Sequence, residues 1–392
     1  MNNYLLNNEV QEFINSHLNS DIVSILLKGT TFPNVETKEL IEQIEAKKKC
    51  EKKLPIWFKT SNIYYPNKLN IEQTSSEVTA KYKSNLITGI SLIDLTGGFG
   101  VDSYYFSEHF NEVIHCEIHK SLSEIVRHNY KMLNRTIKTI NCDGIQFLEE
   151  NDTTFDWMYL DPSRRNEHKG KVFFLRDCLP NVPEHIDLLF QHSKNIMIKT
   201  SPLLDISVGI DELKFVKEIH IIAVENEVKE LLWILESNFE GDITVTASHL
   251  AKNGTETFSL KLKDEVEIEA EYSNPLTFLY EPNSAILKSG AFKSVSAQLK
   301  VFKLHPHSHL YTLDRLIEFP GRRFKIEMIL PYSKSILKTE LPKKANVTVR
   351  NFPETVSQIR KKFKICDGGD CYLFFTTNMD NEKIVVVCSK ID

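Results

Sequence analysis

Several features that mark other protein classes are missing from these 392 residues. No apolar stretch approaches the length of about 20 residues needed to span a bilayer, and the first residues do not combine a basic stretch with an apolar run. The chain shows no internal repeat and no low-complexity segment. Hydrophobic residues make up 41% and charged residues 26%, close to the averages for soluble globular proteins. We therefore expect two to three folded domains, no membrane insertion and a cytoplasmic location.

Close clusters of metal-ligating residues are also missing. The seven cysteines are scattered, and none forms a close pair of the zinc-binding type. Buried reduced thiols are expected rather than disulfides. The 13 histidines form no ligand pair on a helix, and His305, His307 and His309 alternate around Pro306 in a loop or an edge strand. We predict that the protein has no metal site.

The charge is unevenly distributed along the chain. From Phe319 to the end, 14 Lys and Arg face 8 Asp and Glu, a balance of +6, whereas the first 318 residues carry −11. A basic C-terminal segment fits a polyanionic partner such as RNA, although a solvated surface gives the same count.

The central part of the chain alternates apolar runs with amphipathic stretches, which predicts an α/β fold with a mostly parallel sheet. The seven predicted strands are Leu92 to Leu95, Val113 to Ile118, Ile137 to Asn141, Trp157 to Leu160, Ile196 to Lys199, Ile219 to Val224 and Ile243 to Ala247. The segment from Lys229 to Glu236 is expected to be helical.

The flanking parts show other patterns. Residues 1 to about 60 have apolar positions at helical spacing, and Thr74 with Glu77 predicts a capped helix that runs through Lys83. After residue 250 shorter strands are expected, including Phe258 to Leu262, Val266 to Glu271 and Pro275 to Tyr280. The chain closes with a basic helix over Val356 to Phe363, a glycine turn and a hairpin of Tyr372 to Thr376 with Ile384 to Cys388.

A glycine turn follows the first predicted strand and indicates a nucleotide site. Gly97, Gly98 and Gly100 allow a tight turn and close approach of a ligand. Both NAD-binding and S-adenosylmethionine (SAM)-binding proteins use such turns. Ser103 stands where a dinucleotide fingerprint would have its last glycine, and Asp94 before the turn favours SAM.

Three carboxylates occur at the ends of later strands. Glu117 ends the second strand, where both cofactor classes place a carboxylate for ribose hydroxyls. Asp143 follows the third strand and is a candidate for the adenine amino group, with a plain Asp-Gly turn as the alternative. Asp161 ends the fourth strand and begins the sequence Asp-Pro-Ser-Arg-Arg.

The Asp161 loop resembles the Asp-Pro-Pro-aromatic or Asp-Pro-Pro-Arg motif of nucleic-acid methyltransferases, with two departures. Ser163 replaces the second proline, and Arg164 replaces the aromatic residue that would stack on a flipped base. We expect Arg164 to meet a phosphate or a carboxylate, because like charges repel the sulfonium. Arg164 and Arg165 as plain surface charge is the alternative.

Methylation of uracil at C5 needs a cysteine nucleophile after the fifth strand. Lys199 to Pro202 stands there and contains no thiol. Cys178 falls in a connecting segment, and we interpret it as structural.

Taken together and in this order, the motifs resemble a class I SAM-dependent methyltransferase domain over about residues 60 to 250. The chain is identified more closely as similar to a bacterial methyltransferase family whose members end in a ferredoxin-like and a THUMP-like domain. The motifs that carry this resemblance are Gln73 to Glu77, Thr96 to Asp102, Asp161 to Arg165, Tyr280 to Asn283, Phe319 to Arg322 and Asp367 to Asp370.

The resemblance implies a Rossmann-like seven-stranded methyltransferase sheet between a helical N-terminal part and small α+β C-terminal domains. The implied boundaries are 1–60, 61–250, 251–318 and 319–392. It also implies SAM as cofactor and RNA, such as tRNA or rRNA, as substrate. No obligate protein partner is evident.

The resemblance assigns roles to particular residues. The residues expected to hold SAM are Asp94, Thr96, Gly97, Gly98, Gly100, Glu117 and Asp143. Gln73 and Ser75 are expected near the methionine end, with simple helix capping as the alternative. Those expected at the acceptor are Asp161, Pro162, Ser163 and Arg164. Candidates for RNA phosphates are Arg360, Lys361, Lys362 and Lys364, with a solvated helix face as the alternative.

Other functions stay open at this point. One is an RNA-binding protein that keeps the SAM fold but has lost catalysis. Another is a methyltransferase for a protein or a small molecule. An NAD-dependent oxidoreductase is disfavoured by Ser103 and by the Asp161 loop.

Overall fold

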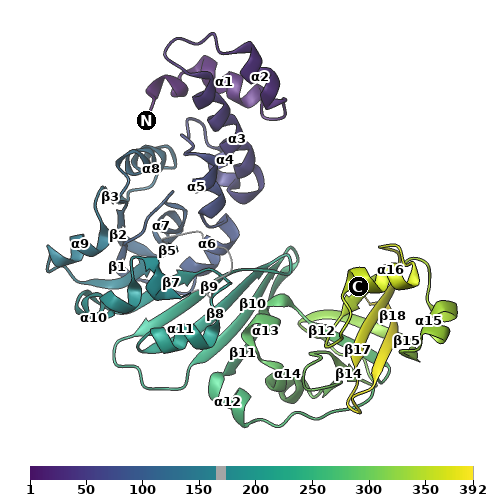
Figure 1. The fold of residues 1–392 in the computed structure, drawn as a ribbon. Coiled ribbons are helices and arrows are strands. Elements are labelled where there is room, and N and C mark those ends of the chain that lie inside the picture. Colours follow the sequence, from purple (N-terminus) through teal and green to yellow (C-terminus); the bar gives the residue numbers. More distant parts are fainter. Residues whose placement is uncertain (165–173, 392) are drawn as a thin grey trace. The chain divides into compact units, whose positions relative to one another are not determined.

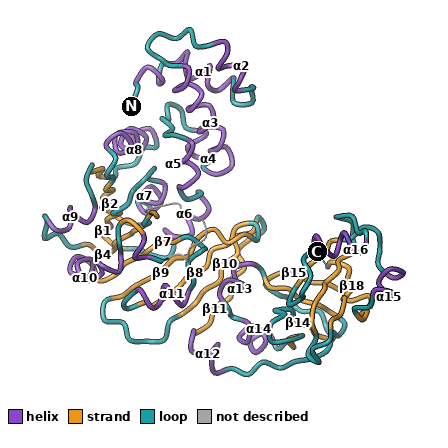
Figure 2. Tube along the Cα trace, in the orientation of Figure 1, coloured by secondary structure: helices purple, strands orange, loops and turns teal. Residues whose placement is uncertain are grey.

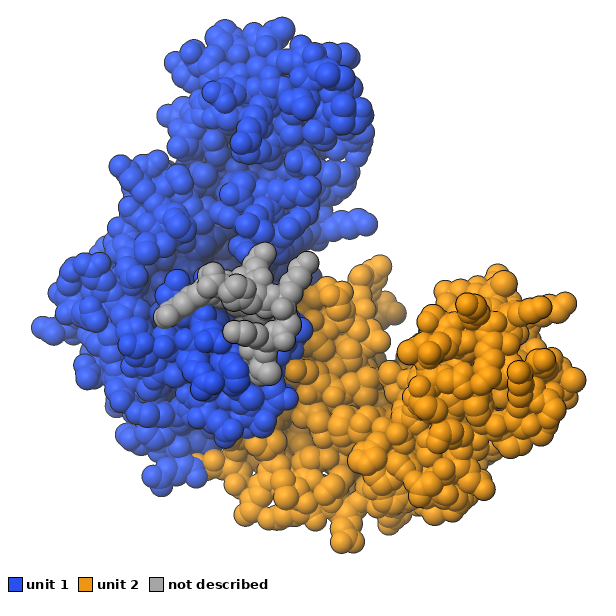
Figure 3. Space-filling view, viewed as in Figure 1, with its two compact units in different colours: residues 1–216, 232–240 blue, residues 217–231, 241–392 orange. Residues whose placement is uncertain are grey.

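The computed structural model describes residues 1–164 and 174–391, and it describes Arg164 by its backbone alone. The chain divides into two compact units (Figure 3). Unit 1 comprises residues 1–216 and 232–240, and unit 2 comprises residues 217–231 and 241–392. In the described residues, no helix combines the length and apolar character needed to cross a membrane.

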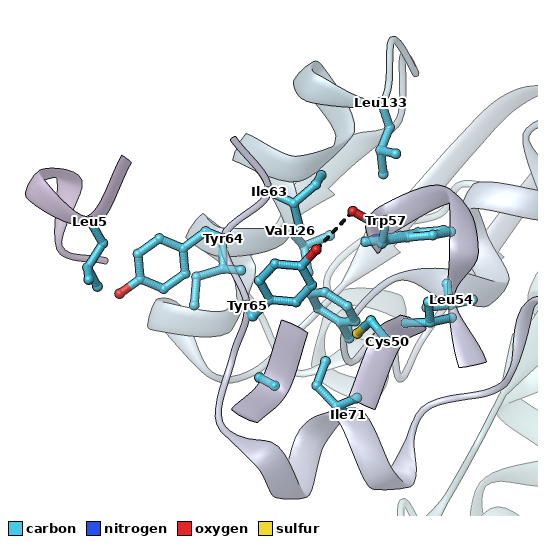
Figure 4. Close-up of a cluster of buried hydrophobic side chains, with 14 of the residues drawn as sticks. Leu5, Cys50, Leu54, Trp57, Ile63, Tyr64, Tyr65, Ile71, Val126 and Leu133 are labelled. Atoms are coloured by element: carbon cyan, nitrogen blue, oxygen red, sulfur yellow. Dashed lines mark hydrogen bonds between the residues drawn. The ribbon is translucent and has the colours of Figure 1, made fainter. Parts of the chain in front are cut away.

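Unit 1 begins with a group of helices, as predicted (Figures 1 and 2). They are η1 (Asn3–Leu6), α1 (Asn8–Ser16), α2 (Ile22–Lys28), α3 (Thr37–Lys53), α4 (Pro55–Lys59) and α5 (Lys68–Gln73). Asp21 caps α2 through the amides of Val23 and Ser24. The helices enclose an apolar core around Trp57 (Figure 4), where the Tyr65 hydroxyl donates to the Trp57 carbonyl at 2.9 Å.

The parallel strands of unit 1 form the Rossmann-like part. They have the order β7-β4-β1-β2-β3, with parallel pairing between neighbours. The strands are β1 (Gly89–Asp94), β2 (Phe110–Cys116), β3 (Lys138–Ile140), β4 (Phe155–Leu160) and β7 (Ser193–Thr200). The helices are α6 (Glu77–Ser84), α7 (Val101–Phe106), α8 (Lys120–Met132), α9 (Gly144–Glu149), α10 (Val182–His192) and α11 (Ile206–Glu212). The prediction of a mostly parallel α/β sheet is therefore confirmed.

Two local predictions about helices are wrong. The N-cap of α6 is Ser76, whose hydroxyl accepts from the Thr79 amide at 3.2 Å, and Thr74 is instead the C-cap of α5. The segment from Lys229 to Glu236 belongs to a strand, β9 (Glu227–Glu236).

The buried residues of β9 form a continuous run from Glu230 to Leu235, and periodicity alone does not distinguish such a run from a buried helix. The turn before β9 favours a strand over a helix for this segment. Glu225 and Asn226 both have positive φ, 50° and 61°, which is the backbone of a two-residue hairpin turn.

Unit 2 contains β8 (Val216–Val224) from Lys217 on, parallel to β10 (Thr244–Ala251), which pairs antiparallel with β11 (Gly254–Lys261). All seven predicted runs thus form strands. The predicted strand from Val266 to Glu271 is wrong, because α12 (Leu262–Glu267) occupies its first part. Asp264 and Glu265 lie in the first turn of this helix, where carboxylates are favourable.

A second sheet in unit 2 unites the C-terminal strands in the order β13-β14-β12-β15-β18-β17-β16. The strands are β12 (Phe278–Pro282), β13 (Phe302–Lys303), β14 (Tyr311–Leu313), β15 (Gly321–Pro331), β16 (Asn346–Val349), β17 (Cys371–Thr377) and β18 (Lys383–Lys390). The helices are α13 (Ser284–Ser289), α14 (Phe292–Leu299), α15 (Lys334–Glu340) and α16 (Val356–Phe363). The predicted terminal helix and the hairpin, β17 with β18, are confirmed.

The cysteines are free thiols, and four of them, Cys50, Cys116, Cys178 and Cys388, are buried. Within residues 1–164 and 174–391, no three His, Cys, Asp or Glu side chains converge on a point that could hold a metal ion. His305 instead contacts the side chains of Asn381 and Asn351, at 3.1 and 3.0 Å.

Candidate functional site

The carboxyl ends of the parallel strands in unit 1 meet at one edge of the sheet. The Gly97 amide, after β1, donates to the Cys116 carbonyl at the end of β2 at 2.8 Å. The Asp161 amide, after β4, donates to the Thr96 hydroxyl at 2.6 Å. The predicted residues after three different strands therefore lie together, at the edge where doubly wound folds bind ligands.

The three glycines of the turn meet two different requirements. Gly98 and Gly100 have φ of 57° and 77°, a left-handed conformation that costs a residue with a side chain roughly 1–2 kcal/mol. Gly97 is needed for space, because a Cβ there would lie 2.0 Å from Cε1 of His115. The turn thus depends on a buried histidine that the sequence patterns did not single out.

Asp94 supports the turn from beneath. Its side chain is buried, and its two carboxylate oxygens accept from the Thr96 amide at 3.1 Å and from the Ser103 hydroxyl at 2.6 Å. Burial raises the pKa of Asp94 to about 7, although these two hydrogen bonds oppose the shift. Ser103, which weakens a dinucleotide fingerprint, is here the partner of Asp94.

His115 and Tyr130 contact the same turn region, through Ser103 and Gly100. Nδ1 of His115 lies 3.3 Å from the Ser103 hydroxyl, and Nε2 has no hydrogen-bond partner among the described residues. Burial lowers the pKa of His115 to about 3, so the imidazole is neutral at physiological pH. The Tyr130 hydroxyl donates to the Gly100 carbonyl at 3.0 Å.

Glu117 lies directly beside the turn. Its carboxylate accepts from the Gly98 amide at 3.0 Å and from the His119 amide at 2.7 Å. Burial raises its pKa, and the two amide donors oppose the shift. The predicted position of a carboxylate next to the glycine turn is therefore realised in the fold, while its contact with a ribose stays a prediction.

Asp143 follows β3 and acts as the N-cap of α9. Its Oδ1 accepts from the amides of Ile145 and Gln146, at 2.8 and 3.3 Å. The structural role of Asp143 is therefore helix capping, and Gly144 is the first residue of α9 rather than part of an Asp-Gly turn. Oδ2 makes no hydrogen bond to the described residues, so capping leaves one oxygen available.

The loop after β4 brings Asp161 to the sheet edge, where its carboxylate forms an ion pair with Lys199 at the end of β7. Pro162 is buried and Ser163 is exposed. The backbone of Ser163 and Arg164 forms β5, which pairs with β6 (Cys178–Leu179). Arg165 lies outside the described residues.

A buried charged network lies behind Asp161 and was missed by the sequence patterns. Lys83 is 3.1 Å from Oδ1 of Asp102 and donates to the Ser75 hydroxyl at 2.9 Å. Oδ2 of Asp102 accepts from the hydroxyls of Ser75 and Tyr159, both at 2.8 Å. Burial alone would raise the pKa of Asp102, but the ammonium groups of Lys83 and Lys199 hold it below its ordinary value.

Of the two residues predicted at the methionine end, Ser75 belongs to this network and Gln73 does not. The Ser75 hydroxyl is already bound within the network, so Ser75 positions Asp102 and Lys83. Gln73, the last residue of α5, is exposed, and its side chain makes no hydrogen bond to the described residues. A lysine at the end of an apolar strand, as at Lys199, is the sequence feature that could have indicated the network.

Half of the predicted phosphate-binding group on α16 is neutralised within the protein. Arg360 pairs with Asp367, and Lys362 pairs with Glu354 at 2.8 Å. Lys361 and Lys364 are exposed and make no ion pair with the described residues.

Two family models match the C-terminal part of the chain. Residues 278–320 match a ferredoxin-like domain, and residues 321–390 match a THUMP domain-like model. No curated protein matches the sequence.

One solved structure is similar over nearly the whole chain. It is a protein of Porphyromonas gingivalis W83 described as a "putative methyltransferase", with 32% identity, a TM-score of 0.89 and 98% of both chains covered. More distant is TrmK of M. capricolum, solved with S-adenosyl-homocysteine (SAH), with 13% identity, a TM-score of 0.33, 41% of this chain and 68% of that chain covered. The tRNA m1G37 methyltransferase of M. jannaschii has 15% identity, a TM-score of 0.29, and 42% and 50% covered.

Proposed function

Because the chain belongs to the bacterial methyltransferase family with ferredoxin-like and THUMP-like C-terminal domains, we propose that it transfers a methyl group from SAM to RNA. One observation carries the proposal. Glu117 and Asp161, from the ends of two strands, are both hydrogen-bonded to the same glycine turn, through Gly98 and Thr96.

The residues of this edge fit SAM. The left-handed Gly98 and Gly100 keep the turn free of side chains, which permits a nucleoside to approach the backbone. The Glu117 carboxylate lies beside the turn, where ribose hydroxyls can donate to it. Oδ2 of Asp143 can accept from the adenine amino group. When bound, SAM supplies an activated methyl group whose leaving group needs no further activation.

On the acceptor side, Asp161 is the residue with the clearest role. Its carboxylate is one-third exposed, whereas its partner Lys199 is nearly buried. Lys199 in turn lies close enough to Asp102 to influence its pKa. This support holds the Asp161 carboxylate at the edge, where it can accept a hydrogen bond from the acceptor and align it for transfer.

The C-terminal segment supports RNA as the acceptor. The THUMP-like match covers residues 321–390, and the chain from Phe319 on carries +6. Lys361 and Lys364 offer ammonium groups that no described side chain neutralises, and such groups bind phosphates through charge.

Methyl transfer from labelled SAM into total RNA tests the proposal, with RNA taken from cells that lack the protein. We expect label in RNA with the wild-type protein. Asp161→Ala should lose about 10²-fold or more of the rate, as expected when an aligning group is removed. Asp187→Ala, an exposed position on α10, is the matched control and should retain full activity.

The outcomes separate the alternatives. Label in protein or in a small molecule, and none in RNA, would contradict the RNA proposal while leaving a methyltransferase. SAH binding without any methyl transfer would indicate a binding protein that keeps the fold. The absence of SAH binding would overturn the cofactor assignment.

A further inference from the structure

Lys47 on α3 is buried without a polar partner. Its exposed fraction is 6%, and within residues 1–164 and 174–391 its ammonium makes no hydrogen bond and no ion pair. Its nearest favourable neighbours are the rings of Phe58 and Tyr65, with Nζ 5.8 and 6.0 Å from their centroids. Burial lowers the pKa of Lys47. Contacts with aromatic faces at these distances offset only part of the cost of removing an ammonium from water.

The other buried lysines of the described chain show what is missing. Lys83 contacts Ser75 and Asp102, Lys199 pairs with Asp161, and Lys303 donates to the Pro306 carbonyl at 3.1 Å. Lys47 is the exception among the four lysines that are more than nine-tenths buried in the described residues. The Lys47 ammonium makes no ion pair with the described residues and lines a cavity, so it can pair with an anion from outside the chain.

Lys47 lines a cavity of about 330 Å³ in the N-terminal helical part of unit 1, hereafter the N-terminal cavity. Besides Lys47, the lining comes from α1 and from the segment that runs from Phe58, near the end of α4, to Asn62. Its volume falls at the lower end of the roughly 300–1,000 Å³ typical of small-molecule sites.

The lining of this cavity is polar and largely unused. The side-chain amides of Asn8, Asn15 and Asn62 and the hydroxyl of Ser61 make no hydrogen bond to the described residues. Lys59 adds a second ammonium, and Glu12 adds one carboxylate, so the charged lining carries +1. Amide groups offer a donor and an acceptor each, which is the pattern that matches nucleobase edges and sugar hydroxyls.

We propose that the N-terminal cavity binds a phosphorylated ligand of nucleotide size, with the phosphate on Lys47 and Lys59 and the sugar or base on the amides. Glu12 accepts a hydrogen bond from a sugar hydroxyl or a base amino group. The site lies outside the glycine turn and does not depend on the methyltransferase assignment. A free nucleotide and a nucleotide of an RNA strand share this chemistry.

Calorimetric titration of the full-length protein with uridine monophosphate, with and without saturating SAH, tests the site. We expect binding at submillimolar concentration in both cases, and no measurable binding of uridine, which lacks the phosphate. Lys47→Met should weaken binding by about 10-fold or more, the range for a charge-assisted hydrogen bond. Lys48→Met, on the same helix at a side chain that is 41% exposed and pairs with Glu51, should leave binding unchanged.

A second variant guards against misfolding. Lys59→Gln is at the exposed end of α4 and should weaken uridine monophosphate binding several-fold, because one of the two ammonium groups is lost. Titration with a short oligouridylate distinguishes the sources, since tighter binding than the mononucleotide indicates an RNA strand. No binding of either probe at millimolar concentration, or equal binding by wild type and Lys47→Met, would overturn the proposal.

Discussion

Two regions of unit 1 differ in whether their buried lysines are paired: the sheet edge at the carboxyl ends of the parallel strands, and the N-terminal cavity. At the edge, Lys83 and Lys199 are each matched by a carboxylate, and hydroxyls of Ser75 and Tyr159 complete the network. In the cavity, Lys47 makes no ion pair with the described residues, and its ammonium lies over the rings of Phe58 and Tyr65. Internal pairing suits the proposed role of the edge, which is to align cofactor and acceptor, whereas a charge without an internal partner suits the ligand site proposed for the cavity.

The largest expected effect comes from breaking the matched charge. Lys83→Met leaves Asp102 buried beside fewer positive charges, and we expect a loss of about 3–5 kcal/mol in the free energy of unfolding. Lys47 makes no ion pair with the described residues, so Lys47→Met leaves no carboxylate unpaired there and should be neutral or stabilising. Urea unfolding at pH 7 measures both changes.

Lys81→Met serves as the control for this pair, because it is exposed on the same helix as Lys83. It should change the free energy of unfolding by less than about 0.5 kcal/mol. Equal destabilisation by Lys47→Met and Lys83→Met would remove the contrast between the two regions.

Asp94→Asn tests a buried carboxylate of the same edge that, unlike Asp102, makes no ion pair with the described residues. Its pKa of about 7 in the folded protein lies above the ordinary 3.8, so the folded state binds the proton more tightly. Stability should therefore fall as pH rises from about 4 to about 7. Asn mimics the protonated form, so the variant should gain up to about 4 kcal/mol over wild type at pH 8.

The gain should disappear near pH 4, and thermal unfolding across this range measures it. Asp187→Asn, at an exposed carboxyl on α10, should show no such pH-dependent gain. A constant difference between wild type and Asp94→Asn at all pH values would contradict the burial argument.

Gly97→Ala tests the fit of shapes rather than of charges, with a smaller expected effect. The new Cβ would collide with His115, and overpacking of this kind costs about 1–3 kcal/mol. Combining it with His115→Ala should recover part of the loss, because the two positions share the same space.

Gly98→Ala provides the comparison, since the nearest atom to its Cβ is the Thr96 carbonyl oxygen at 3.8 Å. Its cost comes from the backbone, so adding His115→Ala should give a simple sum of the two effects. Urea unfolding of wild type, of the three single variants and of the two double variants yields the coupling energies.

Much of the site followed from local patterns. Strands that end in Asp94, Glu117 and Asp161 could be predicted because an apolar run followed by a turn residue is a local property of the sequence. Since neighbouring parallel strands end at one edge, these residues could be expected to meet. Their hydrogen bonds to one glycine turn agree with that expectation.

Other features depended on contacts between distant segments. The strand β9 reads like a buried helix until the turn at Glu225 and Asn226 is known. The partner of Asp161 is Lys199, 38 residues away, and no local spacing relates them. The role of Ser75 is set by Lys83 and Asp102, which belong to two different helices.

The sequence by itself determined the order of the strands along the chain, the carboxylates at their ends and the glycine turn, because these depend on neighbouring residues. The tertiary structure decided which charges are matched. Lys83 and Lys47 are both lysines on helices of unit 1, and only packing against distant segments places a carboxylate beside one and an amide-lined cavity beside the other. Burial and pairing are properties of the folded chain, because the low dielectric that makes them costly exists only after folding.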